Sequence, residues 1–333
     1  MADGFGILIA AIGLSYVYAF IGGFTDAANA IATAVGTRAF TPTQAVLVGA
    51  VFELLGALTG TAVALTIGRG IVSPAYVTQS LVVAALLGAM SWSLITYRLG
   101  IPVSETHGLI GAMVGAGLAL AGPEHVNWLG VLPILVATVL SPALGVVAGM
   151  AVLAVAWNVS SGINRSRAMS RFRVLQRLSS VYMAFSHGRN DAQKPMGVLT
   201  LALAVHFGWT DIEVPLWVIV TVAAVAGLGV AAGGWRIIRT LGLRITGLTP
   251  DQGFAAETGA ATVLQLASQV GIPVSTTHTI TAAIVGVGAL RRWSAIRWTL
   301  VGQIAVSWWL TLPATIALGF AWTVVLGAVT GGR

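Results

Sequence analysis

Long apolar stretches follow one another along almost the whole chain. A helix needs about 20 apolar residues to cross a hydrocarbon core of about 30 Å. Stretches of this kind lie at residues 5–35, 43–68, 75–97, 101–121, 128–157, 178–207, 214–235, 252–270, 271–290 and 297–328. The pattern predicts an all-α polytopic membrane protein with roughly 10–12 membrane segments.

Polar residues interrupt four of these stretches. Residues 25–29 read Thr-Asp-Ala-Ala-Asn, and residues 187–195 read His-Gly-Arg-Asn-Asp-Ala-Gln-Lys-Pro, each near the middle of an apolar stretch. The stretches 101–121 and 271–290 both open with proline followed by serine, threonine and histidine. Non-helical backbone is tolerated at membrane depth only where protein or a wet cavity covers it. All four stretches are therefore expected to be broken helices or re-entrant hairpins.

Composition supports a membrane protein and excludes several other classes. The 333 residues are 57% hydrophobic and 8% charged, against about 25% charged residues in a typical soluble domain. A soluble, disordered or nucleic-acid-binding protein is therefore excluded. The absence of cysteine excludes disulfides and thiolate metal sites.

Clustered arginines predict how the chain is oriented in the membrane. Residues 158–177 contain five arginines and no acidic residue: Arg165, Arg167, Arg171, Arg173 and Arg177. Short loops rich in Lys and Arg face the cytoplasm, so this loop is expected on the cytoplasmic side of the cell membrane in a multi-pass protein. The acidic connectors 123–125 and 211–213 are expected outside. The net charge of +7 therefore reflects topology rather than the substrate.

An internal repeat is visible in the motifs. Residues 101–107 read Ile-Pro-Val-Ser-Glu-Thr-His and residues 272–278 read Ile-Pro-Val-Ser-Thr-Thr-His, so six of seven positions match at an offset of 171 (272 − 101). Asp26 and Asp191 recur 165 residues apart (191 − 26), each upstream of its Pro-Val-Ser element. Two motifs that recur in the same order at similar offsets indicate a duplication.

The duplication predicts the domain organisation. We expect a first membrane repeat at residues 1–157, a cytoplasmic Arg-rich linker at 158–177 and a second membrane repeat at 178–333. If the N-terminus lies outside, the second repeat starts inside, and the two repeats are inverted. Inverted repeats with interrupted helices are typical of secondary transporters, whose sites lie between the repeats near the middle of the membrane.

The two Pro-Val-Ser elements are expected to form helix N-termini that bind an anion. Proline in the first turn followed by serine and threonine is typical of a helix start. Such a terminus offers unpaired N–H groups and a positive charge of about half a unit. The hydroxyl groups that would join them belong to Ser104, Thr106, Ser275, Thr276 and Thr277. Glu105 occupies the position that Thr276 has in the second repeat, which puts one acid beside the anion.

Carboxylates within the apolar stretches are expected to bind a coupling cation. A charge at the bilayer centre costs at least about 2.5 kcal/mol, so each one needs a partner or a task. The expected oxygen ligands are Asp26, Asn29, Asn190, Asp191 and Glu257. They suit Na⁺, with Asp26 and Asp191 as its main ligands, and a carboxyl could carry H⁺ instead. Lys194, the only lysine, either offsets substrate charge or pairs with Asp191.

Taken together, these motifs resemble those of the inorganic phosphate transporter (PiT) family. The resemblance rests on residues 23–33 (Gly-Phe-Thr-Asp-Ala-Ala-Asn-Ala-Ile-Ala-Thr), on residues 187–194 and on both Pro-Val-Ser elements, and it covers nearly the whole chain. It implies an inverted-repeat transporter with re-entrant hairpins, often dimeric, that moves phosphate with Na⁺ or H⁺. It also implies a set of residues around phosphate and cation: Asp26, Asn29, Ser104, Thr106, Asn190, Asp191, Ser275, Thr276 and Thr277.

We therefore expect a secondary active transporter that takes up inorganic phosphate by symport with Na⁺ or H⁺, without a cofactor. A sulfate permease of the same family and an uncoupled anion channel are the alternatives. A hydrolase using Ser104 with His107, or Ser275 with His278, is disfavoured because the chain has no Gly-x-Ser-x-Gly elbow. An enzyme is therefore not expected. The expected partners are phosphate, the lipid bilayer and a second copy of the chain.

Overall fold

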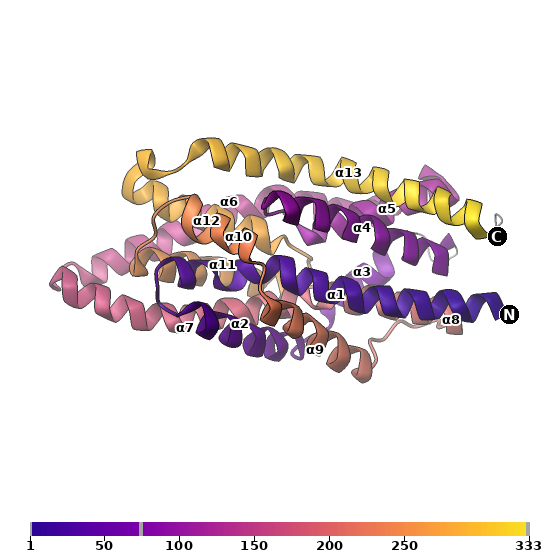
Figure 1. The fold of residues 1–333 in the computed structure, drawn as a ribbon, viewed down its shortest axis with the longest axis horizontal. Helices are drawn as coiled ribbons and strands as arrows, with labels where there is room; N and C mark the ends of the chain where they lie inside the picture. Colours follow the sequence, from indigo (N-terminus) through magenta and orange to yellow (C-terminus); the bar gives the residue numbers. More distant parts are fainter. Residues whose placement is uncertain (1, 73–75, 331–333) are drawn as a thin grey trace.

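The computed structural model describes residues 2–72 and 76–330, which are almost entirely helical (Figure 1). The helices of the first half are α1 (Ala2–Gly36), α2 (Pro42–Ala57), α3 (Ala62–Gly70), α4 (Gln79–Leu99), α5 (Glu105–Ala121), η2 (Pro123–His125) and α6 (Trp128–Ser160). Those of the second half are α7 (Arg165–Asp191), α8 (Gln193–Phe207), α9 (Leu216–Ala232), α10 (Trp235–Arg239), η3 (Thr240–Arg244), α11 (Pro250–Gln269), α12 (Thr276–Arg292), η4 (Trp293–Ala295) and α13 (Trp298–Thr330).

The two halves begin at opposite ends of the helical bundle. In Figure 1, α1 starts at the right-hand end, whereas α7 starts at the left-hand end, where α6 finishes, and leads to α8 on the right. The order of elements also repeats, because a hairpin, α4–α5 or α11–α12, precedes the long helix α6 or α13 in each half. This arrangement is an inverted repeat, in agreement with the sequence prediction.

Each hairpin packs against the long helix of the other half. Helix α5 lies along α13, and α12 lies along α6. Glycines permit this close approach, since a Cβ on Gly115 would lie 1.9 Å from the backbone oxygen of Ile316, and one on Gly145 would lie 2.3 Å from that of Thr279. Small residues at helix crossings are the usual means of close packing in membranes. Because each hairpin packs against the other half, the two hairpin tips are held together at the centre of the bundle.

The helices are those of a multi-pass membrane protein. Among the described residues, four helices are long and apolar enough to span a membrane, or up to six if each of two bent pairs counts as one span. The bent pairs are α2–α3, at 70°, and α9 with α10 and η3, at 57°. The sequence predicts unbroken spans there, but Gly60 and the left-handed Gly233 (φ +68°) fall at the two bends. The remaining helices are shorter or more polar, as half-helices and hairpin arms are.

The breaks predicted at the two aspartate motifs turn out differently. Helix α1 continues through Asp26 without interruption, so the prediction of a break there is wrong. The helix does not have to unwind to give the Asp26 carboxylate a partner, because Thr277 at the hairpin tip of the second repeat donates to it from another element. The second motif does break, at Ala192 between α7 and α8. Pro195 causes the break, because it has no N–H to donate to the carbonyl four residues earlier, that of Asp191.

The Arg-rich stretch is helical for most of its length. The sequence predicts a linker at residues 158–177, but α6 extends to Ser160 and α7 begins at Arg165. Asn164 caps α7, because its side-chain oxygen accepts a hydrogen bond from the backbone N–H of Ser166 at 3.0 Å. The two long helices are therefore joined by a turn of only a few residues, at the end of the molecule away from both termini (Figure 1).

Candidate functional site

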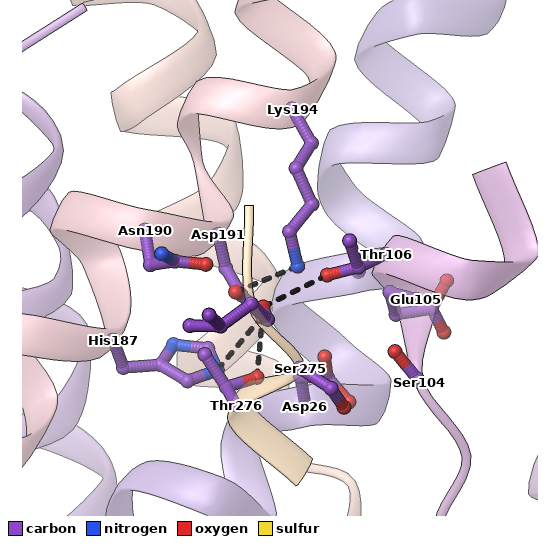
Figure 2. Close-up of polar contacts among 12 residues, drawn as sticks. Asp26, Ser104, Glu105, Thr106, His187, Asn190, Asp191, Lys194, Ser275 and Thr276 are labelled. Atoms are coloured by element: carbon purple, nitrogen blue, oxygen red, sulfur yellow. Dashed lines mark hydrogen bonds and ion pairs between the residues drawn. The ribbon is translucent and has the colours of Figure 1, made fainter. Parts of the chain in front are cut away.

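The tips of the two hairpins bring two helix N-termini together. Ser104 and Ser275 are the N-caps of α5 and α12, and each hydroxyl accepts a hydrogen bond from the backbone N–H three residues later, at 3.2 and 3.1 Å. The Thr106 hydroxyl donates to the backbone oxygen of Val274 at 3.1 Å, across the two repeats. Figure 2 shows both tips beside the aspartate motifs. Two positive helix ends therefore meet in the buried centre of the protein.

Helix α1 contributes one face to this centre. Asp26 and Asn29 are three residues apart, so their side chains lie on the same side of the helix. The Asn29 amide donates to the hydroxyls of Thr277 at 2.8 Å and Thr276 at 3.2 Å, and the Thr277 hydroxyl donates to Asp26 Oδ1 at 3.4 Å. Asp26 Oδ2 and Asn29 Oδ1 are buried and have no hydrogen-bond partner among the described residues. Two oxygen atoms therefore remain available to a ligand.

Asp191 links the broken helix to the second hairpin. One carboxylate oxygen accepts a hydrogen bond from Lys194 Nζ at 2.7 Å, and the other accepts one from the Thr276 hydroxyl at 2.9 Å (Figure 2). His187 Nε2 lies 3.2 Å from that second oxygen. Asn190 is best placed with its amide oxygen accepting from Ser268 and its nitrogen donating to Asp191 Oδ1 at 3.2 Å. Lys194 thus pairs with Asp191 in this conformation.

A buried histidine extends the network to a second acid. His187 Nδ1 lies 2.6 Å from Glu53 Oε2, and both side chains are almost completely buried. The imidazole therefore bridges Glu53 on α2 and Asp191 at the end of α7. From the sequence, Glu53 is an acid within the apolar stretch 43–68 and only a secondary candidate for cation binding, and no role is predicted for His187.

The two repeats differ at this bridge. Gly188 of α7 packs against the backbone of Glu53, and Gly23 of α1 packs in the same way against Ala226 of α9. The position equivalent to the histidine is Gly22 (187 − 165), and the position equivalent to the glutamate is Ala226. Of these two contacts, the α2–α7 contact therefore contains an acid–histidine pair, whereas the α1–α9 contact has small residues, Gly22 and Ala226, at the equivalent positions.

Glu105 brings a further carboxylate to the first helix N-terminus. Its side chain accepts hydrogen bonds from the hydroxyls of Thr25 at 3.0 Å and Ser93 at 2.7 Å. The Tyr18 hydroxyl donates to the backbone oxygen of Glu105 at 3.2 Å. Glu105 therefore ties the start of α5 to both α1 and α4.

Acidic groups outnumber cationic ones at this centre. A small cavity of about 20 Å³ is lined by Tyr18, Glu53, Glu105, Asp191 and Lys194, among others. That volume is enough for about one water molecule, so a tetrahedral oxyanion enters only if the hairpin tips move away from α1 and α7. Oxygen atoms of Asp26 and Asp191 and a ring nitrogen of His187 lie within 4.8 Å of one another, as in a cation-binding group. The centre therefore combines oxygen and nitrogen atoms that could hold a cation with two helix N-termini that attract anions.

The structure separates Glu257 from this centre. Its carboxylate, which is fully buried, accepts hydrogen bonds from the hydroxyls of Thr33 at 2.5 Å and Ser180 at 2.9 Å, from Ser179, and from the Gln176 amide at 3.5 Å. Thr33 lies about two turns along α1 from Asp26. The other sequence-predicted residues meet in one place, whereas Glu257 forms a second polar cluster of its own.

A glutamine to which motif reasoning assigns no role positions α3 beside the site. The side-chain oxygen of Gln193 accepts hydrogen bonds from the backbone N–H groups of Val63 at 2.8 Å and Ala64 at 3.2 Å. It therefore caps α3, whose own N-cap, Thr61, makes no side-chain hydrogen bond. Gln193 is the first residue of α8, directly after the break at Ala192, so α3 is fixed beside that break. Contacts between residues about 130 apart carry no local sequence signal.

Comparisons with known proteins identify the relatives of this chain. The sequence profile of the phosphate transporter family matches residues 22–165 and again residues 157–319. The chain is 46% identical to the "Probable low-affinity inorganic phosphate transporter" of Rhizobium meliloti (strain 1021), over 93% of each sequence. It is 40% identical to the protein of the same name from Bacillus subtilis (strain 168), over 90% of this chain and 91% of that one.

A solved structure has the same fold. It is described as "The sodium-dependent phosphate transporter", and the two structures superpose with a TM-score of 0.87 at 30% sequence identity. The match covers 97% of this chain and 100% of the other. The relatives are named as transporters and not as enzymes. The profile, the sequence relatives and the shared fold together show that this chain belongs to the phosphate transporter family.

Proposed function

We propose that this protein takes up inorganic phosphate across the cell membrane by symport with Na⁺ or H⁺. The observation that carries the proposal is the meeting of two helix N-termini with a cluster of buried carboxyl groups. In the proposed assignment, phosphate contacts Asn29, Ser104, Glu105, Thr106, Asn190, Lys194, Ser275, Thr276 and Thr277. The cation contacts Asp26, Asn29, Asn190 and Asp191. Glu257 lies in a separate cluster and would bind a cation independently of them.

Charge gives the reason for coupling. The carboxyl groups of Asp26, Glu53, Glu105 and Asp191 lie at this centre together with Lys194 and His187. A phosphate anion brought to this cluster is repelled unless Na⁺ or H⁺ neutralises part of its charge. Moving the anion into a cell interior at negative potential costs a further 2.3 kcal/mol or so per charge per 100 mV. The same cation therefore serves both binding and uphill movement.

The hairpin tips supply the groups that recognise an oxyanion. Hydroxyl and backbone N–H donors at the starts of α5 and α12 satisfy several oxygen atoms at once, and the helix ends add positive potential. Thr276 and Thr277 already donate to Asp191 and Asp26. In the proposed cycle these hydroxyls turn to phosphate once a cation has taken over the carboxylates, which links cation binding to substrate binding.

The experiment that tests the substrate is uptake of labelled phosphate into proteoliposomes with competing anions. Unlabelled phosphate is expected to compete fully, whereas the same concentration of sulfate leaves uptake almost unchanged. The physical reason is protonation, because phosphate at neutral pH donates hydrogen bonds to Glu105 or another carboxylate, and sulfate has no proton to donate. Equal competition by sulfate would identify a sulfate permease instead.

A further inference from the structure

An open apolar groove runs between α6 and α7 near the turn that joins them. Its cavity measures about 550 Å³. The floor is a cluster of three buried side chains, Ala156, Ala168 and Phe172. The α6 wall includes Val155 and Val159, which are 63% and 77% exposed. An exposed apolar hollow of this size on a membrane protein is open to lipid chains.

One charged side chain lines this groove. Arg171 stands on its α7 wall and is exposed. It lies six residues into α7, about 9 Å along the helix from Arg165. Neither helix offers it a carboxylate nearby, since no Asp or Glu occurs between Glu124 and Asp191. A cation beside lipid-facing valines requires an anionic partner, and the long arginine side chain reaches toward the headgroup region to find one.

A polar hollow adjoins the apolar one. Its cavity, of about 310 Å³, shares Ser160, Ile163 and Ala168 with the groove and is also lined by Arg165 and Arg291. Trp157 and Asp251 line it too, and the indole N–H of Trp157 donates to the Asp251 carboxylate at 2.8 Å. Trp157 lies three residues before the end of α6, and tryptophan near the end of a spanning helix is typical of the boundary between hydrocarbon and headgroups. The two hollows together therefore have the polarity of one lipid molecule, with an apolar groove leading to a basic polar end.

We propose that this groove is a binding site for one anionic glycerophospholipid of the cytoplasmic leaflet. An acyl chain lies along the groove over Phe172, and the phosphate lies where the two hollows meet, within reach of Arg171 and Arg165. The site is distinct from the transport site, which lies at the opposite end of α7. Three basic side chains, Arg165, Arg171 and Arg291, line the two hollows against one acidic one, Asp251. This excess of positive charge favours an anionic lipid over a zwitterionic one.

Native mass spectrometry of the full-length protein tests the proposal, with phosphatidylglycerol and phosphatidylcholine of matched chains as probes. The substitution Arg171→Gln is expected to weaken phosphatidylglycerol binding about fivefold. The matched control is Arg173→Gln, which removes the same charge from the opposite face of α7 and should leave binding unchanged. Phosphatidylcholine binding should be weak and equal in all three proteins. Equal losses in both variants, or equal affinity for the two lipids, would overturn the proposal.

A second pair of variants tests the groove itself without changing charge. Val155→Trp fills the groove and is expected to reduce phosphatidylglycerol binding at least as much as Arg171→Gln. Val147→Trp alters the same helix at a residue equally exposed (64%) but outside the groove, and should have no effect. If Val155→Trp instead dissociates a dimer and leaves the lipid adduct intact, the groove is covered by a second copy of the chain, and the lipid proposal is wrong.

Discussion

Replacing Asp191 with asparagine is expected to reduce phosphate uptake to the level of protein-free vesicles. Asp191 holds Lys194 at 2.7 Å, the Thr276 hydroxyl at 2.9 Å and His187 at 3.2 Å. An amide keeps the shape but leaves Lys194 as a buried charge without its counter-ion, which typically costs about 3–5 kcal/mol. It also removes a negative charge from the proposed cation site. The measurement is uptake of labelled phosphate by reconstituted protein.

Asp26→Asn separates the loss of a cation ligand from the loss of an ion pair. Asp26 forms no ion pair within the described part of the chain, and the hydrogen bond that it accepts from Thr277 is long, at 3.4 Å. The variant should therefore fold and enter the membrane normally, yet lose uptake. Glu213→Gln, in an exposed acidic connector, is the matched control and should retain full uptake. Full activity in both Asp26→Asn and Asp191→Asn would contradict the proposed site.

Gly188→Ala is expected to disturb the site strongly, although it adds only one methyl group. The new Cβ would lie 2.0 Å from the backbone oxygen of Glu53 and 2.8 Å from its Cα. Helices α2 and α7 must then separate, which breaks the 2.6 Å contact between Glu53 and His187. Overpacking of this kind usually costs about 1–3 kcal/mol. Both thermal stability in detergent and phosphate uptake should fall, and both can be measured on the same preparation.

Gly108→Ala is the control for that packing argument. Gly108 is also buried within a helix, yet nothing lies within 4 Å of the Cβ it would gain. The variant should have the melting temperature of the unaltered protein. If Gly188→Ala is as stable and as active as Gly108→Ala, the tight α2–α7 contact is not needed for the site.

Short motifs are sufficient to predict the elements that form the site. Ser104 and Ser275 each begin a helix, as the Pro-Val-Ser pattern indicates, because proline and a hydroxyl cap act over only three or four residues. The inverted order of the halves also follows from two repeated motifs and the arginines around residue 165. These features are local or periodic, so they are legible in the chain itself.

Contacts between distant residues are not predictable in the same way. Glu53 and His187 are 134 residues apart, and no pattern along the chain links an acid on α2 to a histidine on α7. Helix α1 stays intact at Asp26 because Thr277, 251 residues away, donates to the carboxylate from another element. The sequence groups Glu257 with Asp26 and Asp191 because all three are acids within apolar stretches. The hydroxyl groups that donate to the Glu257 carboxylate instead hold it in a separate cluster. In each of these cases the outcome depends on tertiary contacts between segments that are far apart in the sequence.

Uptake of labelled phosphate into proteoliposomes under separately imposed gradients tests the coupling of phosphate to a cation most directly. An inward Na⁺ gradient, an inward H⁺ gradient and no gradient are compared for the unaltered protein and for Asp26→Asn. We predict that phosphate accumulates above its external concentration under one of the two gradients, and that Asp26→Asn abolishes this accumulation. Mere equilibration of phosphate, at the same rate with and without either gradient, would show an uncoupled channel and contradict symport.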